Sequence, residues 1–262
     1  MTAIHTFAIC AYKDSPYLET LIDSLKKQTF QGSRILLATS TPSPFLEGVA
    51  KRYALPYCIN PEQKGIASDW NFALACSETE LITIAHQDDV YFPDYAQCII
   101  AAMQNNADAT LAFTNYGDLC EGKLYKHRLY LEIKRMLLWA FYLKRSHRSK
   151  WMKKSALVFG NAICCPSVTF RQTGEKPICF DNTFSVNLDW AMWLKLAEKP
   201  GAFVYIPQMM MAHRIAESME TANAIKDNRR YEEDLRIFEM LWGPKTAKLL
   251  MKFYKKAYHY AD

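Results

Sequence analysis

The chain has 262 residues, of which 50% are hydrophobic and 23% are charged, and its formal net charge is +5. This balance is ordinary for a globular protein, so it excludes a disordered, collagen-like or low-complexity chain, and the length suits one large domain. The longest strongly apolar runs, such as 136–143, are too short to cross a bilayer, and no signal-peptide pattern opens the chain. We therefore expect a cytosolic protein.

The first half of the chain alternates short apolar runs with helical patterns. Such runs are compatible with buried strands, while apolar residues spaced three and four apart mark one face of a helix. Ser15 is the expected cap of the first helix, with Pro16 in its first turn. The predicted strands cover 5–11, 34–39, 57–60, 81–85 and 110–116, and the predicted helices cover 15–25, a segment ending near 53, 65–75 and a segment starting at 93.

Alternation of strands and helices indicates a mostly parallel sheet with helices on both faces. Ligands of such sheets bind beyond the carboxyl ends of the strands. The segments 12–14, 39–43 and 86–89 fall at that edge. The sequence contains neither G-x-G-x-x-G nor a P-loop, which argues against a dinucleotide enzyme and an NTPase.

The second half has a different pattern and no Gly/Ser linker, so we expect it to pack onto the same sheet. Strands are predicted over 164–170 and 202–206, and helices over 187–198, 219–241 and 245–258. We divide the integrated domain into a donor-binding half (1–119), a basic helical insertion (120–156), an acceptor-binding and catalytic half (157–244) and a basic C-terminal helix (245–262).

Positive charge is concentrated in two segments. Residues 123–154 carry a net charge of +10 and residues 245–262 carry +4, so the remainder carries −9. Both segments interleave basic with apolar and aromatic residues, a pattern typical of helices on an anionic membrane surface. The alternative is a solvated helix face packed on the acidic body. No nucleic-acid motif accompanies the charge, so we expect no nucleic-acid partner.

The eight cysteines include no C-x-x-C pair, so the sequence predicts neither a zinc motif nor a redox motif. Most lie among apolar residues, and we interpret them as small buried hydrophobic residues.

Asp88 and Asp89 close the apolar strand 81–85. Adjacent carboxylates repel each other unless positive charge lies nearby, and a divalent cation supplies it. Carboxylate oxygens suit Mg²⁺ or Mn²⁺, which in turn hold phosphate oxygens. The alternative is a turn in which one Asp caps the helix that starts near Pro93.

Four segments in order resemble the family 2 glycosyltransferases, and together they cover nearly the whole chain. They are 9–19 with 24–29, a strand, turn and helix ending in Ser-Leu-Lys-Lys-Gln-Thr; Asn60, Gly65 and Asn71; the run His86-Gln87-Asp88-Asp89 through Pro93; and 187–190, Asn-Leu-Asp-Trp.

The resemblance implies a GT-A fold, a nucleotide-diphosphate sugar donor, a divalent metal (Mn²⁺ or Mg²⁺) and an acceptor hydroxyl bound by the second half. It assigns the general base to Asp189 and the metal to Asp88, with Asp89 in support. A helix N-terminal Asp stabilised by the helix dipole is the alternative for Asp189. The residues expected at the nucleotide sugar are Ala11, Tyr12, Lys13, Thr39, Ser40, Gly65, Asp69, Asn71, Gln87 and Arg214.

The chain departs from the family pattern at two places. His86 stands where the family has its first metal-loop Asp, with Gln87 next to it. The acidic turn that often follows the second strand is replaced by Ala38-Thr39-Ser40-Thr41. The resemblance therefore leaves the nucleobase open.

Further candidates lie in the second half. Asn161 and Arg171 are expected to face the acceptor. His213 and Arg214 are expected to follow the last core strand, where His213 would complete the metal shell or bond the diphosphate and Arg214 would neutralise the diphosphate. The alternative is a His-Arg pair at a strand end without a role in the site. Ser218 and Thr221, with Glu220 nearby, have the pattern of a helix start.

The function expected is inverting transfer of a sugar to a glycan or lipid-linked acceptor in cell-surface polysaccharide synthesis, in the cytoplasm or peripherally at the inner face of the membrane. The alternatives are a metal-dependent nucleotidyl- or phosphotransferase and a catalytically silent protein that binds sugar nucleotides.

Overall fold

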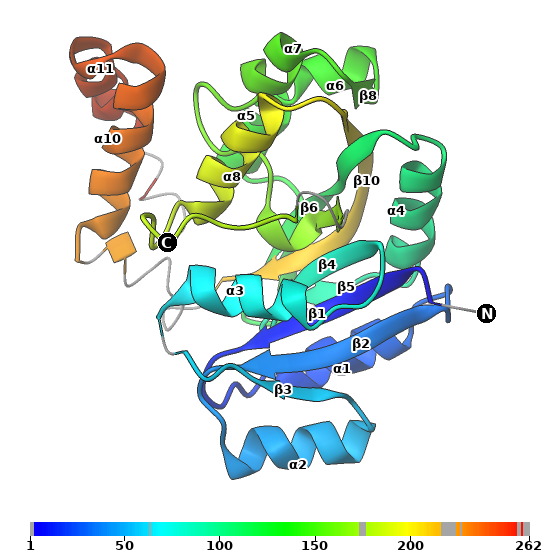
Figure 1. Cartoon of the computed structure of the whole chain (residues 1–262). Coiled ribbons are helices and arrows are strands. Elements are labelled where there is room, and N and C mark those ends of the chain that lie inside the picture. The colour runs from blue at the N-terminus through cyan, green and yellow to red at the C-terminus, as the bar shows by residue number, and fades with distance from the viewer. Residues whose placement is uncertain are drawn as a thin grey trace.

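A computed structural model describes residues 3–62, 64–172, 177–215, 224–225, 227–255 and 258. Within these residues one sheet of ten strands has the order β3-β2-β1-β4-β9-β6-β10-β5, with β7 paired to β6 and β8 to β10. Strands from both halves of the chain therefore share one sheet, and helices cover both of its faces (Figure 1).

The strands are β1 (His5–Ala11), β2 (Ser33–Thr39), β3 (Tyr57–Ile59), β4 (Leu81–His86), β5 (Val90–Tyr91), β6 (Ala109–Cys120), β7 (Lys123–Tyr125), β8 (Ser146–His147), β9 (Val168–Arg171) and β10 (Ala202–Arg214). The helices are α1 (Leu18–Lys26), α2 (Pro44–Tyr53), α3 (Ile66–Ala75), α4 (Tyr95–Gln104), α5 (Leu129–Leu137), α6 (Trp139–Leu143), α7 (Lys150–Ser155), the single 3₁₀ turn η1 (Cys165–Ser167), α8 (Leu188–Ala197), α10 (Arg229–Trp242) and α11 (Pro244–Tyr254).

Strand β1 shows how the sheet separates two hydrophobic cores. Successive side chains of a strand point to opposite faces. Phe7 and Ile9 pack in the core formed with α1, α2 and α4, whereas Ala8 packs in the core formed with α3 and α8. All three side chains are fully buried. A strand buried on both faces has a continuous apolar run, which is why 5–11 could be recognised.

The long strands β1, β2, β4, β6 and β10 run in one direction. The first three pair in parallel, β9 lies antiparallel between β4 and β6, and β10 pairs in parallel with β6. Ala11 lies beside Thr39 and Cys10 beside His86, so the carboxyl ends of β1, β2 and β4 form one edge. The predicted mostly parallel sheet is therefore confirmed, with β9 as an antiparallel insertion.

Strands β6 and β10 are longer than predicted. Each provides the hydrogen-bonding partner of the other as far as the pair Arg214 and Leu119, although the register shifts between Ile206 and Met211. The expectation that His213 and Arg214 follow the last strand was wrong, because both lie within β10.

Two predicted element starts were also wrong. Helix α1 begins at Leu18, because the hydroxyl oxygen of Ser15 accepts a bond from Tyr17 N and donates to Asp88 instead of capping the helix. Strand β9 begins at Val168 because Pro166 lies in η1, where a missing backbone N–H costs nothing.

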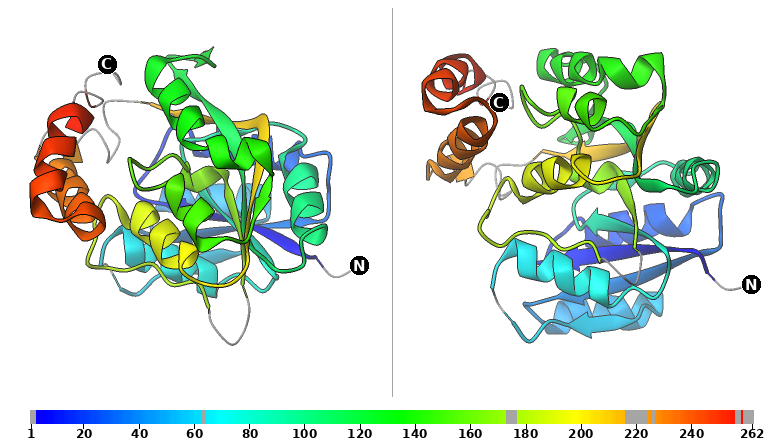
Figure 2. Two further views of the ribbon diagram at one scale, coloured as in Figure 1. Left: turned by 90° about the horizontal axis from the view of Figure 1, so that it is seen from above. Right: turned by 45° about the horizontal axis from the view of Figure 1, so that its top comes forward.

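The insertion contains β7, α5, α6, β8 and α7, and the chain ends in the paired helices α10 and α11. Both regions lie at the end of the molecule opposite α2 and β3 (Figure 2). Ser218, Glu220 and Thr221, with the start of the predicted helix 219–241, lie outside the described residues. All eight cysteines are free, but only Cys165 is buried and Cys179 is exposed, so their predicted burial was largely wrong.

A buried polar network crosses the sheet at His5. Its Nδ1 lies 2.9 Å from Ser33 Oγ and its Nε2 lies 2.9 Å from Thr83 Oγ1, which in turn bonds Thr169. Burial lowers the pKa of His5 to about 3, so the imidazole is neutral in the folded protein at neutral pH.

This burial predicts a pH-dependent stability. Above pH ~6.5, the ordinary histidine pKa, His5 is neutral in both the folded and the unfolded chain. Below pH ~6.5 His5 binds a proton in the unfolded chain but not in the folded protein. The free energy of unfolding therefore falls by about 1.4 kcal/mol per pH unit until the pH approaches about 3. Urea unfolding across this range should show the His5→Gln variant losing that part of the slope, while His127→Gln, an exposed histidine, should keep it. Parallel curves for wild type and His5→Gln would contradict the prediction.

Candidate active site

The loops after β1 and β4 are joined by a reciprocal pair of hydrogen bonds. Tyr12 N donates to Gln87 Oε1 (3.1 Å), and Gln87 Nε2 donates to Tyr12 O (3.0 Å). The predicted site residues Tyr12 and Gln87 are therefore adjacent, and Ala11 lies just behind them at the buried end of β1. The amide of Gln87 is engaged in shaping the loop.

Lys13 adopts a left-handed backbone conformation, with φ of 58°. This conformation costs a non-glycine residue about 1–2 kcal/mol and persists only where neighbours hold it. Lys13 N donates to Thr41 Oγ1 (2.6 Å), and Thr41 N donates to Thr39 Oγ1 (3.0 Å). In this turn the side chains of Lys13 and Tyr12 are exposed at the edge of the sheet.

Asp69 connects the loop after β2 to the start of α3. Ser40 Oγ donates to its Oδ2 (2.9 Å) and Asn60 Nδ2 donates to its Oδ1 (3.0 Å). Gly65, whose φ of 92° favours glycine, precedes the helix and lets it start beside β3. Asn71 is used differently, because both atoms of its amide bond the backbone of Phe180.

Asp89 is a fully buried carboxylate that ties the loop after β4 to β10. Its Oδ1 accepts a bond from Arg214 N (2.9 Å) and lies 3.0 Å from His213 Nδ1. Its Oδ2 is buried without a hydrogen-bond partner among the described residues. Burial disfavours the charged form of His213, but Asp89 outweighs this and raises the pKa of His213.

Asp88 lies on the more open side of the same loop. Its Oδ1 accepts a bond from Ser15 Oγ (2.8 Å), and its backbone oxygen accepts one from Arg214 Nε (2.8 Å). Desolvation raises the pKa of Asp88, and the neighbouring Asp89 adds to this, against the lowering by Ser15, His213 and Arg214. Arg214 also stacks on the ring of Tyr17 at 3.9 Å, so its guanidinium is held at the loop.

His86 replaces a carboxylate with a neutral ring. It packs on Trp70 with the ring centroids 5.1 Å apart, and burial lowers its pKa to about 4. Its Nε2 is buried without a partner in the described part of the chain. Two polar atoms of the loop, on His86 and Asp89, are therefore desolvated without compensation, which is common at functional sites.

Asp189 lies in the first turn of α8. Its Oδ2 accepts a bond from Asn161 Nδ2 (2.7 Å) and its Oδ1 accepts one from Trp190 N (2.7 Å). Burial raises the pKa of Asp189, while Arg230 and Asn161 act to lower it. The carboxylate is thus partly desolvated but surrounded by groups that favour its charged form.

Helix α10 fixes the start of α8. Glu233 accepts bonds from the backbone N–H groups of Val186 and Asn187 (2.9 and 2.8 Å), and Asn187 Nδ2 donates to Asp234 (2.7 Å). Asp234 in turn pairs with Arg230 at 3.2 Å. The C-terminal region therefore contributes to the position of Asp189.

Sequence reasoning missed three residues of this site: Ser15, Lys134 and Arg230. Lys134 Nζ donates to Tyr116 OH (2.9 Å), and the ammonium affects the pKa of both Asp189 and His213. The spacing of Leu131, Lys134 and Leu138 places a lysine on the inward face of α5, and that signal could have revealed it. Arg171, expected to face the acceptor, instead bonds the backbone oxygens of Ala109 and Met103.

The donor set can be tested for a divalent ion. Over the described ranges no cluster of three or more His, Cys, Asp or Glu side chains is arranged to hold a metal. Mg²⁺ and Mn²⁺, however, are commonly bound by one or two protein ligands together with substrate phosphates. Asp88 is only partly buried, and His213 has one ring nitrogen held by Asp89, the arrangement that orients a metal-binding histidine. These residues fit an ion that binds together with a phosphate.

Comparisons with known proteins point to a family and to a fold. The sequence model described as "Glycosyl transferase family 2" matches residues 6–169, more than half of the chain. No curated protein sequence matches. Among solved structures, S. aureus TarS 1-349 is 13% identical with a TM-score of 0.64, over 95% of this chain and 69% of that one. TarS 1-349 in complex with UDP-GlcNAc is 14% identical with a TM-score of 0.63, over 95% and 70% of the two chains.

A third similar structure is the mannosyltransferase PcManGT from Pyrobaculum calidifontis in complex with GDP-Man and Mn²⁺. It is 13% identical with a TM-score of 0.62, over 97% of this chain and 75% of that one. At such low identity the structural likeness speaks for the fold, which is of the GT-A type.

The two adjacent aspartates should differ in their contribution to stability. Asp89→Ala leaves Arg214 N and His213 without their buried partner and should lower the free energy of unfolding by about 1–3 kcal/mol. Asp88→Ala removes a partly buried charge that the fold disfavours and should cost about 1 kcal/mol or less. Urea unfolding of both variants measures the difference, and equal losses would contradict the assignment of Asp89 as the structural member of the pair.

Proposed function

Because the chain belongs to glycosyl transferase family 2, we propose that it transfers a sugar, with inversion, from a nucleotide-diphosphate donor to an acceptor hydroxyl. The observation that carries the proposal is that two carboxylates with different surroundings come from two different parts of the fold. Asp88 lies in the loop after β4, Asp189 lies at the start of α8, and Lys134 acts electrostatically on Asp189 and on the imidazole beside the loop.

The donor would bind along the carboxyl edge of β1, β2 and β4. The exposed Tyr12 and Lys13, held by Gln87 and Thr41, are suited to the nucleoside and its phosphates. Ser40 and Asp69, joined to each other, are suited to the ribose or base. Ala11, Thr39, Gly65, Asn71 and Arg214 complete the proposed donor site by shaping these loops.

Asp88 and His213 would hold the divalent ion, with Asp89 orienting the imidazole. When bound, the ion neutralises the charge that develops on the departing diphosphate. Arg214, held between Tyr17 and the backbone of Asp88, adds positive charge to the same loop.

Asp189 would accept the proton of the acceptor hydroxyl. Its burial makes the carboxylate more basic than a free aspartate, which helps a general base at neutral pH. Asn161, Arg230 and Lys134 keep enough charge on it to act. A base on the far side of the sugar from the leaving group gives inversion.

We further propose that the acceptor is a glycan or a lipid-linked saccharide, and that the reaction serves cell-surface polysaccharide synthesis on the cytoplasmic side. The solved structures named above carry UDP-GlcNAc and GDP-Man, so uridine and guanosine donors are the first to test. No helix in the described ranges is long and apolar enough to span a membrane.

Metal-dependent nucleotide binding tests the donor site. UDP or GDP with Mn²⁺ should raise the thermal stability of the wild type, by about 2.7 kcal/mol when the nucleotide is at roughly a hundred times its Kd. Asp88→Asn should lose the manganese-dependent part, whereas Asp23→Asn, on the exposed side of α1, should keep it. An Asp88→Asn variant that responds as the wild type does would remove Asp88 from the metal site.

Turnover tests the base. Asp189→Asn should lower kcat by about 10²–10⁴ with little change in the KM of the donor, because a positioned base acts on the chemical step. Asn161→Ala removes a bond that lowers the pKa of Asp189, so the acidic limb of the pH–kcat profile should move to higher pH. An unchanged kcat in Asp189→Asn would exclude it as the base, and an unmoved limb in Asn161→Ala would leave Asn161 with only a structural role.

A further inference from the structure

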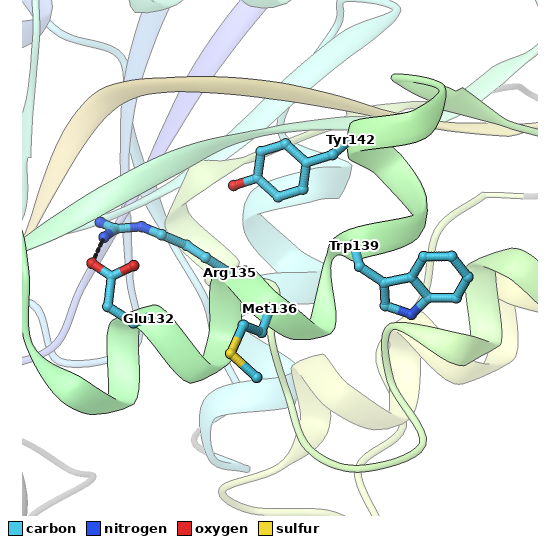
Figure 3. A pocket seen from close by; sticks show the side chains of 5 residues that line it. All are labelled: Glu132, Arg135, Met136, Trp139 and Tyr142. Atoms are coloured by element: carbon cyan, nitrogen blue, oxygen red, sulfur yellow. Dashed lines mark hydrogen bonds and ion pairs between the residues drawn. The ribbon is translucent and has the colours of Figure 1, made fainter.

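The outer side of the insertion exposes more apolar surface than its packing needs. Met136, Leu143 and Trp151 are 70%, 76% and 73% exposed. We call this surface the apolar face, and it consists of Leu129, Ile133, Met136, Trp139, Tyr142, Leu143 and Trp151. Figure 3 shows Met136, Trp139 and Tyr142 around a shallow cavity of about 380 Å³, which Glu132 and Arg135 close on one side.

The apolar face is not the core-facing side of an amphipathic helix. On α5 the core is contacted by Leu131, with Leu138 following, and both are buried, whereas Ile133 and Met136 point the other way. A helix that is apolar on its outer side as well has a second partner.

Part of the charge of the insertion is already paired within the protein. Five of its eleven basic residues form ion pairs: Arg128 with Asp118, Arg135 with Glu132, Arg148 with Asp108, and Lys150 and Lys154 with Glu198. Lys153 is buried against the backbone oxygens of Lys199 and Gly201. Three carboxylates from outside the segment take part in these pairs, so the net charge of the region falls from +10 to +7, and exposed apolar side chains lie among the remaining charges.

Helix α11 carries the complementary surface. Ala247 and Met251 face inward, while Leu249 and Phe253 are exposed between Lys245, Lys248 and Lys252. None of these lysines has a salt-bridge partner in the ranges that the structure describes. Trp242 fixes the helix pair to the segment that directly follows the insertion, because its ring stacks on Phe159 at 5.3 Å and its Nε1 donates to Val158 O (2.8 Å).

We propose that the apolar face and the outer side of α11 together dock on a lipid bilayer with anionic headgroups. Exposed Trp and Tyr rings suit the interface, where one side of the ring is apolar and the other is wet, and free lysines match anionic headgroups. The elements that carry these two surfaces lie at the same end of the molecule (Figures 1 and 2). The apolar face supplies burial and the lysines of α11 supply charge, so the two contributions respond differently to salt.

Docking in this way would bring the catalytic half close to the bilayer. Helix α5 presents Met136 outward, while Lys134 on its inner side bonds Tyr116 and acts to lower the pKa of Asp189. An acceptor anchored in lipid would then reach the base without leaving the membrane surface. The docking itself does not depend on the proposed reaction and can be measured without any donor or acceptor.

Vesicle co-sedimentation of the full chain tests the proposal, with phosphatidylcholine vesicles and vesicles that also contain phosphatidylglycerol. The wild type should bind the mixed vesicles. Trp139→Ser combined with Leu143→Ser should weaken binding at least roughly tenfold at every salt concentration, because two bulky apolar side chains no longer enter the interface. Phe45→Ser, an exposed aromatic on α2 at the opposite end, should bind as the wild type does.

The contribution of the α11 lysines is tested with the same vesicles. Lys252→Glu should weaken binding several-fold at low salt and little at high salt, while the control Lys27→Glu, at an exposed position directly after α1, should have no effect. Absence of wild-type binding to the mixed vesicles would overturn the proposal. So would light scattering that shows a dimer dissociated by the Trp139→Ser, Leu143→Ser pair, because the apolar face would then be covered by a second copy of the chain.

Discussion

The geometry of the proposed active site depends on one buried carboxylate. Asp89 accepts a hydrogen bond from the backbone N–H of Arg214 and holds His213, so the short loop after β4 is fixed to β10, three strands away in the sheet. This contact exists only because β10 continues to Arg214, which in turn requires β6 to continue as its partner. The loop after β4, the imidazole of His213 and the guanidinium of Arg214 are therefore positioned by the length of two strands rather than by their own local sequences.

The fold class could be predicted because its signals are local. Strands such as β1 and β4 are buried on both faces and form continuous apolar runs, and α1 shows the helical spacing of Leu18, Leu21 and Leu25. The ends of β6 and β10 could not be predicted. Their last residues include Asp118 and His213, which have low strand propensity and become strand only because each chain segment pairs with the other.

The same contrast between local signals and distant contacts applies to the residues of the candidate site. Asp88, Asp89 and Asp189 lie in segments that resemble family motifs, so the sequence was enough to select them. Ser15 and Asn161 were not selected for the roles they have, because their partners lie 73 and 28 residues away along the chain. The sequence also did not show that the two adjacent aspartates differ. Asp89 is fully buried, whereas Asp88 lies near the open side of the loop.

The formal charge of a segment differs from the net charge of the folded region in which that segment lies. The insertion is strongly basic as a segment, but Asp108, Asp118 and Glu198 from outside it form ion pairs with four of its cations. These three carboxylates lower the net charge of the region from +10 to +7, and they leave no trace in the composition of the segment itself. The surface of the insertion also carries exposed apolar side chains, while the inner side of α5 carries Lys134, which bonds Tyr116. The same nine residues of α5 thus connect the outer surface of the protein to the environment of Asp189.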